Sequence, residues 1–427
     1  MKSGQCLQKL WLEVLCCAVY FVSYVTRINF GASLSEIIAA ENFLKSSVAI
    51  ATTLSFLSYG VGQIISGYIG DRVSPKWMIF VGLLATGICN VVIAFCRTEA
   101  EMAVVWTING FAQAMLWPPL VKIMADYYEP VQFSRVSSNV VAASSAATVF
   151  IYLCIPLIIQ VGGWRMVFAF SAAAAIGMAL FWLAKMSRIE KNLSRTVPLT
   201  SPQSQQNENN GRKFLWRLTA SSGLLFIFGA IIMQGMMRDG ITTWLPSLVS
   251  ETYGVAPAMS IFMSVLLPVF SMVSLKVFAL IQRKWVHNEV MLSLYLFSTC
   301  AVCCICWGLV YRCNMAVTVL LAAVIMGCTF GINLMLVCMV PKYFAATGRV
   351  SAISGIINFF TYVGSAVSTY GVAKIAEIAG WQMTIWTWLG AAALGIVVCI
   401  LSVRRFAQVR AQARDNTVYP METTKRL

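Results

Sequence analysis

Twelve long apolar runs follow one another along this 427-residue chain. Each run is long enough for a helix to cross a bilayer core of about 30 Å. Hydrophobic residues make up 59% of the chain and charged residues 11%, whereas a soluble domain has about 45–50% and about 25%. We therefore predict an all-α membrane protein whose twelve transmembrane helices cover residues 10–38, 46–69, 77–96, 101–127, 134–160, 165–185, 215–249, 256–281, 289–311, 315–340, 351–375 and 380–403.

One polar segment interrupts the series of short connections. Residues 186–214 are rich in Ser, Asn, Gln and Pro without periodicity, which is typical of a hydrophilic linker. The linker separates an N-terminal six-helix half, residues 1–185, from a C-terminal half, residues 215–403, and a tail follows at 404–427. Of the 31 Lys and Arg residues, 22 fall on the linker's side of the membrane and 5 on the other. Because cytoplasmic loops carry an excess of Lys and Arg, we expect both termini in the cytoplasm.

Two pairs of landmarks recur at nearly the same spacing in the two halves. Trp164 and Trp381 follow similar glycine-containing turns and lie 217 residues apart, and Arg27 and Arg238 lie 211 residues apart. Six-span halves related by an axis along the membrane normal describe the major facilitator fold. We therefore predict this fold, with its two pseudo-symmetric halves and a substrate site near the midplane between them.

Arg27 is a charge inside the first apolar run. An arginine near the centre of a membrane helix costs about 2.5–3.5 kcal/mol by insertion scales, so it needs a partner. Tyr20, Tyr24 and Arg27 are spaced four and three residues apart and therefore share one helix face. We interpret this face as the wall of a water-filled cavity that receives an anion. The alternative is that Arg27 lies near a helix end and extends to the membrane interface.

Four stretches of the chain resemble a known family. They are residues 20–30, the loop GYIGDRVSPK at 67–76, Trp117-Pro118-Pro119, and RDGITTWLP at 238–246. The loop resembles the facilitator superfamily pattern G-x-L-x-D-R-x-x-x-K. Together the stretches resemble the organophosphate:inorganic phosphate antiporter family, which includes glycerol-3-phosphate and hexose-phosphate transporters. The resemblance covers essentially the whole chain.

The resemblance implies that Arg27 and Arg238 bind a phosphate group between them. The chemistry agrees, because a guanidinium binds phosphate through two parallel hydrogen bonds and stays charged at any working pH. A phosphomonoester is close to a dianion at pH 7, since its second pKa is about 6, and two arginines match that charge. An empty site would hold two unpaired cations and a loaded site would be nearly neutral, which favours exchange over net transport.

Several site positions depart from the family pattern. Gln63 stands where the family has a lysine in span 2, Ala143 where it has a histidine in span 5, and Ile28 where it often has a basic residue. Lys276 in span 8 either replaces the missing lysine or extends to the cytoplasmic face.

The remaining site residues are predicted from their places on the spans. We interpret Asp239 as a counter-ion to Arg238, with a proton site as the alternative. Besides Tyr20, Tyr24 and Gln63, the predicted wall residues of the site are Trp117, Asn139 and Tyr362. For these last three, ordinary helix packing explains the position at least as well as substrate contact does.

We therefore predict a transporter rather than an enzyme, with no metal or cofactor. It would import a phosphorylated small metabolite, such as a sugar phosphate or glycerol phosphate, in exchange for inorganic phosphate by alternating access. Its expected place is the bacterial cytoplasmic membrane, as a monomer in the lipid bilayer without nucleic acid. Two alternatives stay open: a sugar-phosphate sensor on the same scaffold, and a proton-coupled symporter for an organic or sugar acid.

Overall fold

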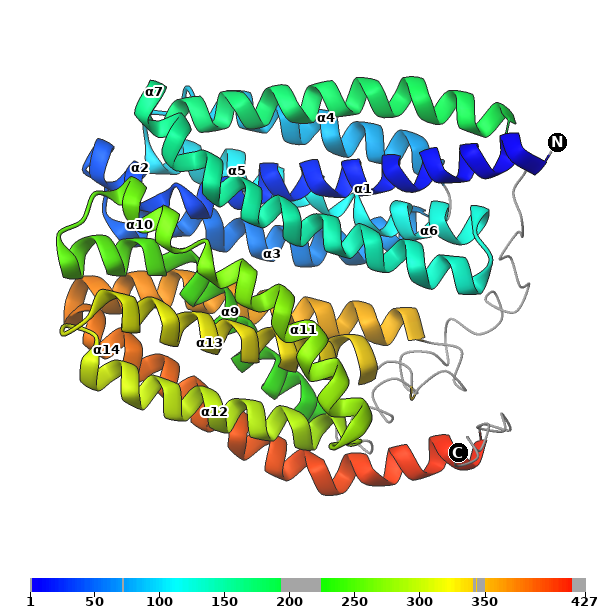
Figure 1. Cartoon of the computed structure of the whole chain (residues 1–427). Helices are drawn as coiled ribbons and strands as arrows, with labels where there is room; N and C mark the ends of the chain where they lie inside the picture. Colours follow the sequence, from blue (N-terminus) through cyan, green and yellow to red (C-terminus); the bar gives the residue numbers. More distant parts are fainter. Residues whose placement is uncertain (1, 71–72, 193–223, 341–342, 344–349, 417–427) are drawn as a thin grey trace.

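The computed structural model describes residues 2–70, 73–192, 224–340, 343 and 350–416. Within these residues almost the whole chain is helical and no strand occurs (Figure 1). The helix before the predicted linker continues to Asn192, past the predicted start of that linker. The rest of the linker and residues 417–427 lie outside the described part.

Three of the N-terminal helices begin or end at residues with clear capping chemistry. Pro75 opens one helix at its first position, and Thr98 and Glu101 form a capping box at the start of another. Asn42 ends a third in the left-handed conformation, with φ 54°. The helices are α1 (Lys2–Ala32), α2 (Leu34–Glu41), α3 (Lys45–Gly70), α4 (Pro75–Ile93), α5 (Glu99–Ala114), α6 (Trp117–Tyr127) and α7 (Pro130–Asn192).

Three of the C-terminal helices begin with the same kinds of capping residue. Pro257 opens one helix, and the side chains of Asn288 and Asn314 accept hydrogen bonds from the first free backbone N–H groups of two others. The elements are α9 (Leu224–Tyr253), α10 (Pro257–Met263), α11 (Leu266–Lys284), α12 (Glu289–Val310), α13 (Met315–Asn333), the π-helical segment η2 (Leu334–Met339) and α14 (Val350–Asn416).

The described helices account for the predicted spans. Nine of them are long and apolar enough to cross a membrane. Two of these, α7 and α14, pass through a sharp bend at Gly162–Gly163 and at Gly380, so each supplies two spans. The short helices α5 and α6 together cover the fourth predicted span. The prediction of an all-α membrane protein is confirmed.

The bends in α7 and α14 have the same backbone conformation. Gly163 has φ 69° and ψ −175°, and Gly380 has φ 77° and ψ 177°, a region essentially restricted to glycine. The tryptophan after each bend donates its indole N–H to a glutamate. Trp164 binds Glu41 at 3.1 Å, and Trp381 binds Glu251 at 2.9 Å. The two halves thus repeat a turn and the contact beside it, as the spacing of the tryptophans predicts.

Small residues bring α9 and α14 together. A Cβ atom added at Gly235 would overlap the carbonyl oxygen of Thr361, and one added at Gly364 would overlap that of Ile232. The two backbones therefore touch directly, which is the use of small residues between membrane helices. This contact sets the spacing between Arg238 on α9 and Tyr362 on α14.

The N-terminal and C-terminal helices are joined by polar contacts at one end of the bundle. We call this the distal end; it is where α9 ends and α3 begins, opposite the end where α1 begins and α14 ends (Figure 1). Lys45 forms an ion pair with Glu251 at 2.6 Å, and Glu377 accepts from the backbone N–H of Ser46 at 2.7 Å and from its hydroxyl at 2.8 Å.

Candidate anion-binding site

A buried polar network fixes the part of α1 that carries Arg27. Gln113 on α5 donates to the Thr26 hydroxyl at 2.9 Å, and Asn29 donates to the Asn90 side chain on α4 at 2.7 Å. Buried polar groups that all find partners specify one arrangement of their helices. Thr26 and Asn29 therefore set the rotation of α1 and with it the direction of Arg27.

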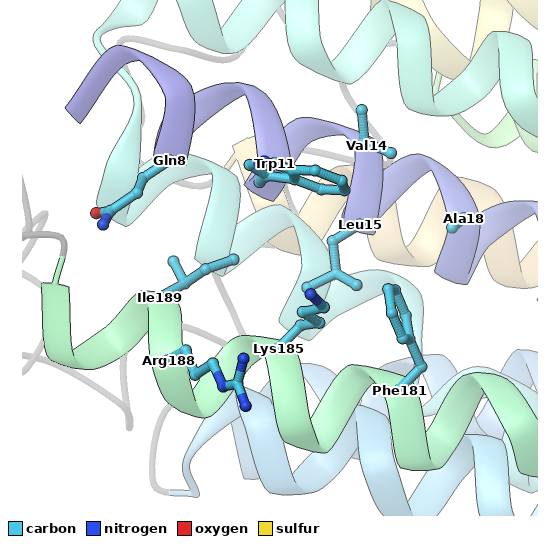
Figure 2. Close-up of a pocket in the computed structure, with 9 residues that line it drawn as sticks. All are labelled: Gln8, Trp11, Val14, Leu15, Ala18, Phe181, Lys185, Arg188 and Ile189. Atoms are coloured by element: carbon cyan, nitrogen blue, oxygen red, sulfur yellow. The ribbon is translucent and has the colours of Figure 1, made fainter. Parts of the chain in front are cut away.

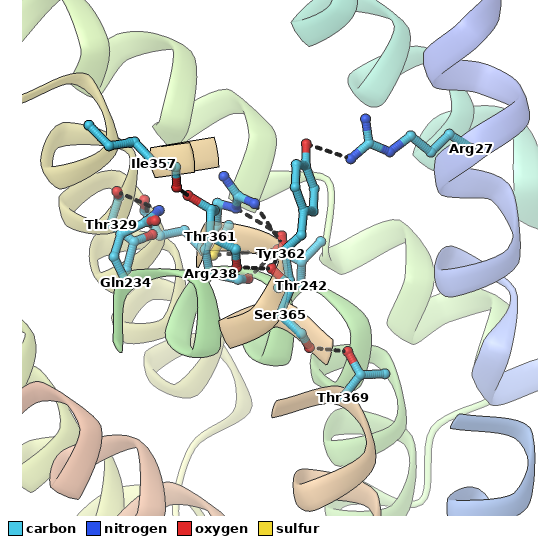
Figure 3. Close-up of polar contacts among 12 residues, drawn as sticks. Arg27, Gln234, Arg238, Thr242, Thr329, Ile357, Thr361, Tyr362, Ser365 and Thr369 are labelled. Carbon is cyan, nitrogen blue, oxygen red and sulfur yellow. Dashed lines mark hydrogen bonds and ion pairs between the residues drawn. The ribbon is translucent and has the colours of Figure 1, made fainter. Parts of the chain in front are cut away.

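Arg27 extends from α1 to the C-terminal helices. Its Nη2 donates to the hydroxyl of Tyr362 on α14 at 3.0 Å (Figure 3). Its guanidinium carbon lies 4.0 Å from the ring centroid of Tyr59 on α3, a cation–π distance. Within the described residues no carboxylate forms an ion pair with Arg27.

A row of aromatic rings continues along α1 from Arg27. The Tyr24 ring centroid lies 5.6 Å from the Arg27 guanidinium, and Tyr20 lies 5.1 Å from Tyr24. Trp117, at the start of α6, lies 4.7 Å from Tyr20. The structure thus brings Tyr20, Tyr24 and Arg27 together on one face, as their spacing predicts. Tyr24 is the member next to the charge.

Arg238 has a carboxylate partner within the protein. Its Nε and Nη2 atoms donate to Asp239 Oδ1 and Oδ2 at 2.8 Å and 2.7 Å, which is the bidentate geometry of a strong pair. The Ser365 hydroxyl on α14 also donates to Asp239 Oδ2. This agrees with the interpretation of Asp239 as a counter-ion. It corrects the expectation of two unpaired cations in the empty site, because a carboxylate already neutralises one of them.

Tyr362 lies between the two arginines. It belongs to α14, one turn before Ser365, and Figure 3 shows its side chain directed toward Arg27. Its ring also contacts Tyr59 from the N-terminal helices, with centroids 4.7 Å apart. Tyr362 therefore connects the two sets of helices at the level of the arginines.

Three predicted site residues have different surroundings. Gln63 lies one turn from Tyr59 on the same face of α3, and its Nε2 is buried with no hydrogen-bond partner among the described residues. Asn139 instead donates to Glu13 at 2.6 Å, and Glu13 lies about 21 Å along α1 from Arg27 at 1.5 Å per residue. Lys276 is exposed on α11, and nothing in the described part joins it to either arginine.

Two residues of this site were not predicted. Tyr59 could have been found, because it precedes Gln63 by one helical turn and so shares its face. Ser365 follows Tyr362 by three residues on α14. Its role could not have been found in the same way, because it depends on how closely α9 approaches α14.

The site combines two guanidinium groups, one carboxylate and several phenols. Arg238 and Asp239 keep only 14% and 16% of their side-chain surface exposed, so their charges interact under weak screening. No group of three His, Cys, Asp or Glu residues that could hold a metal occurs in the described part of the chain. The arrangement can bind an anion through Arg27, whose hydrogen bond and ring contacts among the described residues are with tyrosines rather than with a carboxylate.

A pocket elsewhere on the molecule does not contain these residues. Figure 2 shows it between the first turns of α1 and the last turns of α7, far along α1 from Arg27. Lys185 lies 5.6 Å from the ring centroids of both Trp11 and Phe181 at this pocket. The pocket is therefore mainly apolar with a basic edge, and it is separate from the site between the arginines.

The sequence profile described as Major Facilitator Superfamily matches residues 16–369 of this chain. The chain belongs to the Major Facilitator Superfamily. This membership confirms the predicted fold and places the chain among multi-pass membrane transport proteins rather than enzymes.

Curated relatives of this superfamily member match part of its length. The membrane sensor protein UhpC of Salmonella typhimurium is 25% identical over 254 residues, which cover 55% of each chain. The glycerol-3-phosphate transporter of Bacillus subtilis is 22% identical over 248 residues, 55% of this chain and 56% of the relative. The chain thus spans about half the length of the curated relatives it matches. These relatives confirm, at low identity, the resemblance drawn from the four stretches.

Solved structures extend the likeness to nearly the whole chain. A bacterial homologue of the human lysosomal transporter Spinster, in an inward-facing and unoccupied conformation, aligns with a TM-score of 0.75 at 12% identity, covering 94% of this chain and 98% of that one. A D-xylose-proton symporter aligns with a TM-score of 0.72 at 11% identity, covering 95% and 99%. At these identities the likeness establishes the fold alone.

Proposed function

We propose that this superfamily member imports a phosphorylated small metabolite, such as a sugar phosphate or glycerol phosphate, in exchange for inorganic phosphate. The observation that carries the proposal is the placement of Arg27. This guanidinium is directed into the region between the two sets of helices, and its contacts there are the hydroxyl and rings of tyrosines. A phosphate group supplies the negative charge that Arg27 lacks and accepts its remaining N–H donors.

Exchange follows from the uncompensated charge. In the empty carrier, Arg27 must be enclosed without a counter-ion, and an unpaired charge in a low-dielectric site is costly. A bound anion removes that cost, so the loaded carrier closes more readily than the empty one. The argument rests on one unpaired arginine, since Asp239 already neutralises Arg238.

The membrane orientation belongs to the same proposal. We place the chain in the bacterial cytoplasmic membrane as a monomer, with both termini in the cytoplasm, as the distribution of Lys and Arg predicts. The distal end then faces outward, and its contacts between Lys45 and Glu251 and between Ser46 and Glu377 hold the outer entrance closed. Alternating access requires these contacts to break once in every cycle.

A flux assay tests the proposal. Purified protein is reconstituted in vesicles loaded with radiolabelled phosphate, and efflux is measured while a panel of phosphate esters is added outside. At least one ester should accelerate efflux well above the rate without external anion. If no ester does so at any pH tested, the chain is not an exchanger of this class.

A sensor is the second candidate, because one of the relatives is described as a membrane sensor protein. A sensor would bind the same anions at the same arginines without moving them. Binding measured on the purified protein, together with the absence of flux in the same vesicles, would favour this alternative.

A further inference from the structure

The charge of the site differs from that of two bare arginines. Arg27 and Arg238 contribute two positive charges and Asp239 contributes one negative charge. Asp239 is held on both oxygens, by Arg238 through two hydrogen bonds and by the Ser365 hydroxyl, so it is a fixed part of the site. The residues that form the site therefore carry one net positive charge.

The groups around Asp239 do not alter this sum. Arg27 on α1 lies within electrostatic range of it, as does the Tyr152 phenol on α7. The other titratable groups that act on the two arginines are phenols, which are neutral near pH 7: Tyr24 on α1, Tyr59 on α3 and Tyr362 on α14. Lys276 is exposed on α11 and is not among the groups that act on Arg27, Arg238 or Asp239.

We propose, on the basis of the function proposed above, that the site accepts a tetrahedral anion of one net negative charge. Phosphate or a phosphate ester then binds as its monoanion. A dianion would leave one negative charge uncompensated among groups with little exposed surface, and it binds only if a proton accompanies it onto the anion or onto Asp239. Both routes bring the same number of protons into the loaded site, so both give the same dependence on pH.

Three probes of fixed chemistry test this inference on the full-length purified protein. Inorganic phosphate changes from monoanion to dianion near neutral pH, sulfate is a dianion throughout, and methyl sulfate is a monoanion throughout. Binding of each is measured calorimetrically between about pH 6 and about pH 8. The dissociation constant of phosphate should rise several-fold between about pH 6 and about pH 8, because the fraction of monoanion falls as the second pKa of phosphate is passed. Methyl sulfate should bind equally at all pH values and more tightly than sulfate.

Two variants separate the charge of Asp239 from its hydrogen bonds. Asp239→Asn raises the net charge of the site to two, so sulfate should bind at least about tenfold more tightly and phosphate should lose most of its pH dependence. Ser365→Ala removes a hydrogen bond to Asp239 but keeps the carboxylate, so the phosphate profile should keep its slope. Methyl sulfate binding to each variant shows whether the site has folded.

Some results would overturn the inference without touching the proposed function. The inference fails if phosphate binds the unchanged protein as tightly at about pH 8 as at about pH 6. It also fails if sulfate binds as tightly as methyl sulfate. A Ser365→Ala profile as flat as that of Asp239→Asn would contradict it as well. Conversely, if methyl sulfate binds but phosphate binds at no pH, the proposed function fails while the preference for one charge stands.

Discussion

Lys45 of α3 and Glu251 of α9 meet across the two sets of helices, with Nζ 2.6 Å from Oε2. The same carboxylate oxygen accepts the indole N–H of Trp381 at 2.9 Å. In the N-terminal helices the matching glutamate, Glu41, also binds a tryptophan, but its cationic partner is Arg165 of the same set. The contact of Glu41 therefore lies within the N-terminal helices, whereas the contact of Glu251 joins the two sets of helices at the distal end.

Glu251→Gln should loosen the distal end. The Lys45 and Glu251 side chains keep 17% and 41% of their surface exposed, so solvent screening limits the pair to about 1 kcal/mol or less. We expect a shift of a few-fold in the population open at this end, measured by distances between spin labels on α3 and α9. Glu41→Gln is the matched control and should leave those distances unchanged. If both variants change the label distances equally, the ion pair between Lys45 and Glu251 does not hold the distal end closed.

Glu377→Ala should open the distal end further than Ser46→Ala. The Glu377 carboxylate accepts from both the backbone N–H and the hydroxyl of Ser46, so it satisfies the start of α3 from the other set of helices. Removing the carboxylate loses both bonds, whereas removing the hydroxyl loses one. The same label distances report the order of the two effects. A larger effect of Ser46→Ala would contradict this account of the contact.

Arg27→Lys should lower phosphate exchange by at least about tenfold, or about 1.4 kcal/mol. Lysine keeps the charge but lacks the planar group that donates two parallel bonds and lies against the Tyr59 ring. Exchange rates in loaded vesicles measure the change. Arg165→Lys, at the distal surface, is the control and should keep near-normal exchange. Normal exchange by Arg27→Lys would mean that Arg27 does not bind the phosphate.

Tyr362→Phe should weaken the contact between the two sets of helices at the site. The ring stays, but Arg27 loses its hydroxyl acceptor at 3.0 Å, a hydrogen bond to a charged group worth about 1.5–3 kcal/mol. The exchange rate should change by about tenfold or more. An increase would show that the Tyr362 hydroxyl competes with the anion for Arg27, and a decrease would show that it does not. Tyr370→Phe, exposed on the same helix, provides the comparison. No difference between the two variants would remove Tyr362 from the site.

Gly235→Ala should destabilise the protein. The added methyl group would overlap the Thr361 carbonyl oxygen, and overpacking of this kind costs about 1–3 kcal/mol. Thermal unfolding of the purified protein should show a lower Tm. Gly390→Ala on α14 has open space around the new methyl group and should leave Tm close to that of the unchanged protein. A similar Tm for both variants would mean that α9 and α14 are not in backbone contact.

The sequence predicted the features that depend on local patterns. Long apolar runs predicted the spans, and the tryptophans 217 residues apart predicted the repeated bends that Gly163 and Gly380 form. Arg27 and its two tyrosines were recognised because a charge in an apolar run is rare and the period of a helix decides which residues share its face.

Other features depend on how closely helices approach, which no local pattern encodes. Asn139 was expected in the site wall, but its helix places it beside Glu13 instead. Tyr362 and Ser365 contact Arg27 and Asp239 only because glycines allow α14 to lie directly against α9. The contacts of the distal end join residues more than 200 positions apart in the chain.

The first arm of α14 carries both the site and the distal contact. Tyr362 and Glu377 lie on one uninterrupted stretch of helix before the bend at Gly380, separated by 15 residues or about 22 Å. A stiff rod of this length acts as a lever. In the proposed exchange cycle, an anion that took the place of the Tyr362 hydroxyl as the acceptor for Arg27 would let the helix tilt at that point, and we expect a larger displacement at Glu377. Occupancy of the site and the distal contact would then be coupled through one continuous stretch of helix.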